Sequence, residues 1–442
     1  MIFCKKVRKV EVIFLRRNSR GRNNKKKPKN TINYKKTNKI LISTISILFI
    51  ALALVAIFYY FKNRNDYQNL VSSYKQEIEN EEKANEENKT NNNSEETQTD
   101  TTFTLTAIGD IMCHNTQYID AYNDETGEYD FSYVFDDISL YTKTADICVG
   151  NLETTFAGED VGYSSYPTFN TPDSLAYELK DIGVDVLSTA GNHALDKGFN
   201  GLSRTIDVLN DADISHLGTY KTKEEQDKTL IKYVKGIKIA FVNFAYGTNG
   251  IPIPSDKPYC VNLIDENLMK EQIDRAKQEE PDIIIACMHW GTEYKTTPNS
   301  TQEQLTDFLF KNGVDIILGT HPHVLEPMEK RTVTLDDGTT KDGFVIYSLG
   351  NFIADQNAEY TRDSIILNID ITKHTDGKIT IDNYKYVPIY MYKDTSKKKQ
   401  KMKLLDINKN IYNYENYLDN NISKSLYNTL KNELSKIQKI LD

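Results

Sequence analysis

Two histidines, His321 and His323, flank Pro322 directly after a short apolar segment, and both side chains could do metal chemistry. The segment at 314–318 is apolar and rich in β-branched residues, which is typical of a buried strand, and Gly319 ends it. Imidazole is the commonest metal-ligating side chain, and two of them on one proline-stiffened turn can face one cavity. The same spacing also fits an ordinary surface loop, so the hypothesis of a metal site depends on the rest of the chain.

The elements that would position this pair alternate between strands and helices. We predict strands at 103–108, 146–149, 185–188, 238–244, 282–288, 315–318 and 344–348, with further alternating segments at 364–393. Helical patterns lie between them at 173–182, 201–211, 266–279 and 301–311. Turns are predicted at 235–236 and at 336–338. This alternation indicates an α/β fold, in which ligands bind beyond the carboxyl ends of the strands.

Six of the predicted strand ends deliver a glycine together with a side chain that can bind a metal or donate a hydrogen bond. The side chains are Asp110 and His114, Glu153, Asn192, His193 and Asp196, His289 and Glu293, His321 and His323, and Asn351. Carboxylate, amide and imidazole groups that gather in this way suit a two-metal hydrolytic centre. The mixed ligand set favours Mn²⁺, Fe or Zn²⁺ over Ca²⁺ or a thiolate-bound metal, so we expect one or two divalent ions as cofactor.

Charge is distributed very unevenly along the chain. Residues 1–39 hold 15 Lys and Arg against one acid, whereas the remainder holds 39 basic and 62 acidic residues. The 22 residues at 40–61 carry no charge and are long enough to cross a bilayer as a helix. Lysines before this segment and aromatic residues at its end predict a single-pass membrane protein with a cytoplasmic N-terminus and an extracytoplasmic main domain. A cleaved signal peptide is the rival interpretation, but no small-residue cleavage site follows the segment. The basic tail is then a topology signal that also contacts acidic lipids, and we expect no nucleic-acid partner.

The predicted organisation has five parts. A basic tail at 1–39 and a transmembrane helix at 40–61 precede a disordered, polar linker at 62–102. The main domain covers 103–393, and a helical extension covers 394–442, in which leucine and isoleucine recur at three- and four-residue steps. Five cysteines with no regular spacing argue against a disulfide framework, and Cys148 and Cys287 lie inside apolar segments.

The ordered motifs GDIM, GNLE, GNHALDKG, HWGTEY, GTHPHV and SLGNF resemble the signature of the CapA (PgsA) family of capsule-biosynthesis proteins, which are associated with poly-γ-glutamate synthesis. The resemblance covers roughly residues 104–392. It implies a metallophosphoesterase-like fold, a four-layer sandwich of two mixed β-sheets flanked by helices. It also implies a metal-ligand set of Asp110, Glu153, Asn192, His289, His321 and His323, with His193 as the catalytic group near the leaving oxygen.

The chain departs from the metallophosphoesterase pattern at three places. The usual Asp-x-His reads Asp110-Ile111-Met112, and His114 is a possible replacement for the missing histidine. Glu153 stands where the pattern has a bridging aspartate, and Thr320 is inserted before the histidine pair.

Two classes of function remain open on the sequence alone. In the first, the site is a metal-dependent hydrolase centre, either within capsule synthesis or as a cell-envelope phosphoesterase unrelated to polyglutamate. In the second, the domain is a non-catalytic accessory subunit of the polymer synthesis and export assembly. The expected partners in the capsule role are the membrane, the subunits of a polyglutamate synthase complex and the polymer itself.

Overall fold

The computed structural model describes residues 99–441 of the protein. The predicted basic tail, the predicted transmembrane helix at 40–61 and nearly all of the predicted linker therefore lie outside the described residues. Within 99–441, no helix combines the length and the apolarity that crossing a membrane requires. The first described strand begins at Thr101, two residues before the predicted strand start at 103.

The first of two mixed sheets has the strand order β14-β13-β12-β1-β2-β3-β4, with β11 paired to β1. Its members are β1 (Thr101–Ile111), β2 (Ile147–Leu152), β3 (Val186–Ser188), β4 (Ser215–Leu217), β11 (Asn351–Ile353), β12 (Asp363–Lys373), β13 (Ile379–Lys393) and β14 (Met402–Asp406). Strands β1 to β4 run parallel, whereas β12 to β14 are antiparallel to their neighbours.

The second sheet has the order β5-β6-β7-β8-β10-β9. Its members are β5 (Leu230–Val234), β6 (Ile237–Ala245), β7 (Ile283–His289), β8 (Ile316–Thr320), β9 (Leu325–Thr334) and β10 (Thr340–Leu349). The four central strands run parallel and the two edge strands antiparallel. Every residue of β7 is buried because both faces of the sheet are covered, which explains its continuous apolar sequence.

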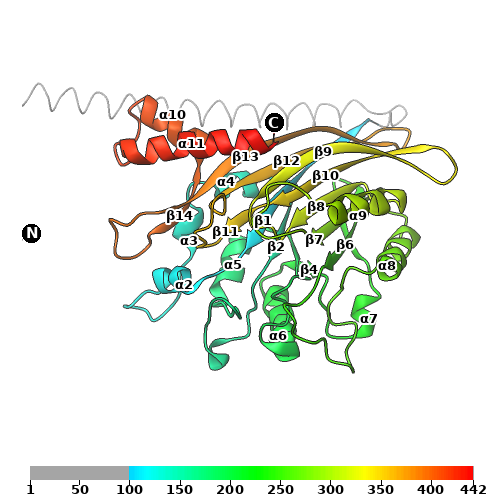
Figure 1. Ribbon diagram of the computed structural model, residues 1–442, viewed down its shortest axis with the longest axis horizontal. Coiled ribbons are helices and arrows are strands. Elements are labelled where there is room, and N and C mark those ends of the chain that lie inside the picture. The colour runs from blue at the N-terminus through cyan, green and yellow to red at the C-terminus, as the bar shows by residue number, and fades with distance from the viewer. Residues whose placement is uncertain (1–98, 442) are drawn as a thin grey trace, which may run out of the picture. The chain divides into compact units, whose positions relative to one another are not determined.

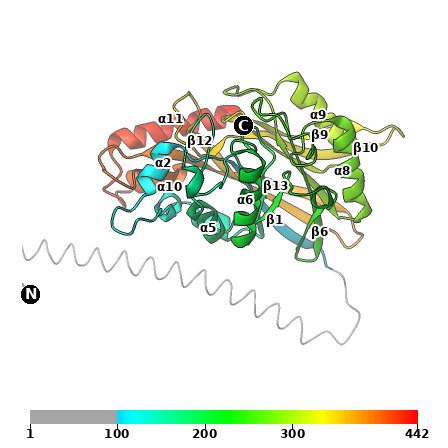
Figure 2. The same ribbon diagram turned by 90° about the horizontal axis from the view of Figure 1, so that it is seen from below.

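Three apolar clusters lie between the layers of the fold. Figures 1 and 2 show the strands of the sheets and the helices around them. Leu105 and Val149 of the first sheet share one cluster with Ile285 and Leu318 of the second, so the two sheets pack face to face. The outer face of the first sheet packs on helices that include α5, and the outer face of the second packs on α8 and α9. The predicted arrangement of two mixed sheets flanked by helices is confirmed.

The helices agree closely with the sequence periodicity. Four of them, α5 (Ser174–Asp181), α6 (Gly198–Asp211), α8 (Glu266–Gln278) and α9 (Ser300–Lys311), match the four predicted segments. Short helices α2 (Asn115–Ala121), α3 (Ser132–Phe135), α4 (Ser139–Lys143) and α7 (Lys223–Gln226) and the 3₁₀ turn η1 (Glu159–Val161) complete the domain. Side chains cap the starts of α8 and α9: Asp265 accepts from the backbone of Leu268, and Asn299 forms a capping box with Gln302.

The C-terminal segment differs from the predicted helical extension at 394–442. Residues Met402–Asp406 form β14, which pairs with β13 and completes the edge of the first sheet. The segment was hard to recognise as a strand because it is short and follows a run of lysines. Helices α10 (Ile407–Glu415) and α11 (Lys424–Leu441) follow, and Leu430 and Ile437 of α11 are buried in the same cluster that joins the two sheets.

Candidate metal centre

Two buried carboxylates come from neighbouring parallel strands of the first sheet. Asp110 lies in β1 and pairs in register with Asn151 of β2, and Glu153 follows the end of β2 directly. A side chain at Gly109 would place its Cβ 1.9 Å from the carbonyl oxygen of Gly350, so only glycine allows β1 to approach this turn. Both Asp110 and Glu153 are buried.

Three histidines face these carboxylates from the second sheet. His289 is the last residue of β7, and His321 and His323 lie in the turn that follows β8. The backbone φ angles of His321 and His323 are 96° and 62°, a left-handed conformation that non-glycine residues rarely adopt. Strained backbone of this kind is concentrated at functional sites, where the surrounding structure holds it in place.

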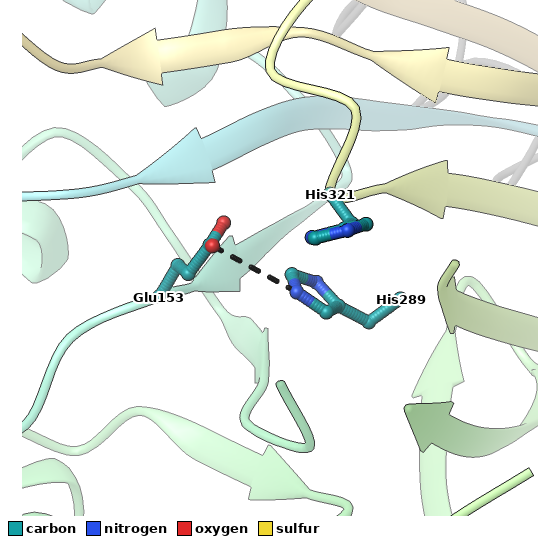
Figure 3. A group of neighbouring side chains, drawn as sticks. All are labelled: Glu153, His289 and His321. Carbon is teal, nitrogen blue, oxygen red and sulfur yellow. Dashed lines mark ion pairs between the residues drawn. The ribbon is translucent and has the colours of Figure 1, made fainter. Parts of the chain in front are cut away.

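The potential ligand atoms of these residues converge in overlapping groups. Glu153, His289 and His321 form one group, and Asp110, Glu153 and His323 form another, each with its ligand atoms within 4.8 Å of one another. Glu153 belongs to both groups. Figure 3 shows its carboxylate pointing at the ring of His289, whose Nε2 lies 3.8 Å from the Glu153 oxygen.

The carboxylates of this cluster have no positively charged partner in His289 or His321, as the pKa shifts of these groups show. Burial, followed by the negative charge of Asp110, raises the pKa of Glu153 well above its usual range. Burial lowers the pKa of His289 well below its usual range and that of His321 to about 3. His289 and His321 are therefore neutral at pH 7, and the contact between His289 and Glu153 is not a pair of opposite charges.

Neighbouring polar groups hold the candidate ligands in position. The Asn151 side-chain amide donates to an Asp110 oxygen at 2.9 Å, and its nitrogen lies 3.3 Å from Nδ1 of His289. The hydroxyl of Thr320 lies 3.1 Å from the same Nδ1. Nδ1 of His323 lies 3.2 Å from the side-chain oxygen of Asn351. Such contacts fix the tautomer and direction of a metal-binding imidazole.

Asn192 and His193 follow β3 and reach the same site. The Asn192 side-chain oxygen lies 3.0 Å from Nε2 of His289. His193 Nδ1 lies 2.7 Å from an Asp196 oxygen, which also accepts a 2.6 Å hydrogen bond from the backbone of Phe169. The other ring nitrogen of His193 lies 3.5 Å from the Asn249 amide, so this imidazole is oriented from both sides.

The remaining expected residues occupy the edge of the site. Glu293 is exposed and forms a third group of possible ligands with His321 and His323. His114, considered as a replacement ligand, precedes α2 and accepts a backbone hydrogen bond from Asp355 at 3.2 Å, and it belongs to none of the three groups.

Sequence reasoning missed several groups around the site. Tyr246 covers His321, with ring centroids 4.4 Å apart, and its neighbour Asn249 contacts Asn192. Both follow the carboxyl end of β6, a predicted strand whose end was passed over because it carries no histidine or acid. Asn151 and Thr320 were likewise absent from the expected site residues, although each contacts His289. The signal that could have found them was their position at strand ends.

The cluster fits a divalent cation by the chemistry of its atoms. Both carboxylate oxygens of Glu153 and Nδ1 of His321 are buried without a hydrogen-bond partner in residues 99–441. Orphaned buried acceptors are costly, and a cation would satisfy them. No cysteine belongs to the ligand groups found among residues 99–441, so the candidate ligands are nitrogen and oxygen atoms.

Comparisons with known proteins agree with the order of the motifs. The family model described as bacterial capsule synthesis protein PGA_cap matches residues 104–356. The chain is 30% identical over 274 residues to the capsule biosynthesis protein CapA of Bacillus anthracis, which covers 60% of this chain and 62% of that protein. It is 29% identical over 310 residues to the PGA biosynthesis protein CapA of Bacillus subtilis, covering 69% and 77%. The chain thus spans somewhat less than two thirds of the Bacillus anthracis protein.

Solved structures with a similar backbone arrangement have lower sequence identity to this chain. The NAD nucleotidase of Haemophilus influenzae aligns at a TM-score of 0.43 with 14% identity, covering 78% of this chain and 57% of that one. The calcineurin-like phosphoesterase YfkN of Bacillus subtilis aligns at 0.38 with 16% identity, covering 65% and 90%.

Proposed function

Since the chain belongs to the bacterial capsule synthesis protein family PGA_cap, we propose that it acts in the synthesis or export of a poly-γ-glutamate capsule through a divalent metal centre. The observation that carries the proposal is the convergence of Asp110, Glu153, His289, His321 and His323 around orphaned carboxylate oxygens. Two curated relatives carry the name of probable polyglutamine synthesis accessory proteins of Mycobacterium tuberculosis, which is consistent with a role beside a synthesis complex.

Glu153 is the residue that would be shared between two ions. Asp110 and His323 complete one ligand group and His289 and His321 the other, and the Asn192 oxygen can join the second. The nitrogen and oxygen ligands suit Mn²⁺, Fe or Zn²⁺. When bound, such an ion supplies Lewis acidity toward a phosphoryl or acyl oxygen and acidifies water for attack.

His193 is the group that we assign to proton transfer. Asp196 accepts the hydrogen bond from Nδ1 and stabilises the charged imidazole, which leaves Nε2 able to give a proton to a leaving oxygen. The backbone bond from Phe169 holds Asp196 in place. His193 follows Asn192 directly, so the turn that places a ligand also places the acid.

We further propose that the main domain works outside the cytoplasm, anchored by the uncharged segment at 40–61. The charge asymmetry of the chain supports this location, and the expected partners are subunits of a polymer synthase and the polymer. A phosphoesterase of the cell envelope is the second candidate function. The oriented His193–Asp196 pair favours it, because binding a polymer needs no general acid.

The test measures bound metal and polymer on the same variants. Purified full-length protein should carry a divalent metal by elemental analysis, and His289→Ala should lose it. His193→Ala should keep the metal and the melting temperature but lower polymer output or turnover by about a hundredfold. As a matched control, His216→Ala removes a histidine of β4 that belongs to none of the ligand groups. Normal polymer from His193→Ala at normal abundance would make the domain an accessory subunit, and metal content unchanged in His289→Ala would remove the metal centre.

A further inference from the structure

A cavity of about 720 Å³ opens beside α2, the turn that follows it and the start of α5. None of the candidate metal ligands lines it. Its size is that of a small-molecule site. The side chains that matter below are five tyrosines, Tyr118, Tyr122, Tyr129, Tyr163 and Tyr177, four carboxylates, Asp124, Glu128, Glu159 and Asp173, and one lysine, Lys399.

Four of the tyrosine rings form a continuous aromatic wall. The Tyr129 ring is the centre of this wall, with centroids 5.1 Å from Tyr122 and 5.2 Å from Tyr163. Tyr118 touches both Tyr129 and Tyr163, at 6.5 and 6.2 Å. Most of these contacts are edge-on or tilted, so ring faces as well as edges are available to the cavity.

The phenol groups of the wall are available to a ligand. Among residues 99–441, Tyr133, Tyr141 and Tyr347 each donate to a carboxylate. The five cavity tyrosines have no such hydrogen bond within the described part of the chain. Burial and the charges of Asp173 and Glu159 raise the pKa of Tyr163 to about 12, so its hydroxyl stays protonated. The hydroxyl of Ser174, another lining residue, is buried with no hydrogen-bond partner among residues 99–441.

The charge of the cavity is negative. Four carboxylates and one ammonium group line it: Asp173 pairs with Arg204 at 2.6 Å and Asp124 lies 3.7 Å from Lys399, whereas Glu128 and Glu159 have no ion-pair partner within residues 99–441. Lys399 is an example of an ammonium group that contacts a ring of this wall. Its ammonium lies 5.6 Å above the Tyr122 ring and donates to the carbonyls of Ile119 and Tyr122 at 3.0 Å.

We propose that this cavity binds an organic cation, a primary or quaternary ammonium group of a small ligand, between the Tyr129 ring and the carboxylates of Glu128 and Glu159. Aromatic faces attract ammonium groups through their negative quadrupole, and carboxylates add Coulomb attraction. A polyanion would meet like charge here, so the cavity is distinct in chemistry from any polymer track. The proposal does not depend on the metal centre.

The test uses choline and its neutral isostere, 3,3-dimethyl-1-butanol. Ligand-observed NMR titrations are made on the full-length protein in a polyoxyethylene detergent, which carries neither sugar nor ammonium. We expect choline to bind and the isostere to bind at least about fivefold more weakly, from the loss of the cation–aromatic attraction. Raising the salt concentration from low to physiological should lower the affinity for choline, because the carboxylates are exposed and salt screens their charge.

Variants separate the wall from the rest of the surface. Tyr129→Leu should weaken choline about two- to fivefold. The exposed pair Glu128→Gln and Glu159→Gln should weaken it about fivefold or more without affecting the fold. Tyr233→Leu and Glu280→Gln, which change an exposed tyrosine and an exposed carboxylate of other elements, serve as matched controls and should leave binding unchanged. Glucose is titrated as a neutral sugar probe. The assignment would be overturned if the isostere bound as tightly as choline, if glucose bound and choline did not, or if the carboxylate variants left choline binding unchanged.

Discussion

The Glu153→Gln variant tests two effects of this carboxylate separately: its destabilisation of the metal-free fold and its contribution to metal binding. The Glu153 side chain is fully buried, and neither oxygen has a hydrogen-bond partner within residues 99–441. Glutamine keeps the shape of the side chain and removes its charge. Its amide can also donate to Asp110, whose ligand oxygen lies within 4.8 Å of that of Glu153. We therefore expect the metal-free variant to be more stable than the metal-free wild type.

The magnitude follows from the burial of the charge. An unsatisfied buried group costs about 1–3 kcal/mol, and a domain of about 340 residues unfolds with an entropy of about 0.7 kcal/mol/K. The melting temperature of metal-free Glu153→Gln should therefore rise by about 1–4 °C at pH 8. In the wild type, an ion at a hundredfold its dissociation constant should add about 2.7 kcal/mol, or about 4 °C, and this gain should disappear in the variant.

The pH dependence has a defined sign. The folded-state pKa of Glu153 is raised, so the stability that its protonated form provides is fully present below the ordinary value of 4.5 and is lost as pH rises toward the raised pKa. The advantage of the variant should thus be small at pH 4.5 and larger at pH 8.

Thermal melts of full-length protein after chelation, with and without added Mn²⁺ or Zn²⁺, measure both effects. A metal-free variant that melts below wild type at pH 8, or one that gains as much from metal as wild type does, would refute the reasoning. Glu280→Gln, at an exposed position, is the control for loss of a carboxylate alone.

Three further outcomes are expected. Thr320→Val removes the hydroxyl beside His289 and should lower metal affinity about 10- to 100-fold, measured by competition with a chromogenic chelator, with the melting temperature of the metal-free protein nearly unchanged. Burial and the charge of Glu433 raise the pKa of Asp363 to about 9, so the stability of its protonated form is lost between pH 3.8 and 9; Asp363→Asn should raise the melting temperature at pH 8 and have little effect at pH 4. A cysteine placed within 62–102 should react with an impermeant thiol probe in intact cells, and labelling only after lysis would reverse the proposed topology.

The sequence by itself predicted the main strands and helices of the domain and most of the residues that meet at the candidate centre. Apolar, β-branched runs such as Ile283–His289 are set by burial on both faces of a sheet, so they can be recognised locally. The glycine and histidine or acid after each run then indicated which side chains could meet, because parallel strands end at one edge.

Only the tertiary structure decided which groups orient that centre and which stand apart from it. Asn151 and Thr320 were not expected at the site, yet both contact His289 from other strands. His114 is close in sequence to Asp110, but the turn before α2 directs its ring to the backbone of Asp355. Strand β14 was not predicted because it follows a lysine-rich segment at 394–401 and takes its strand conformation from pairing with β13. The contacts of Asn151 with His289 and of His114 with Asp355 join residues that are distant along the chain, so no local pattern contains both partners.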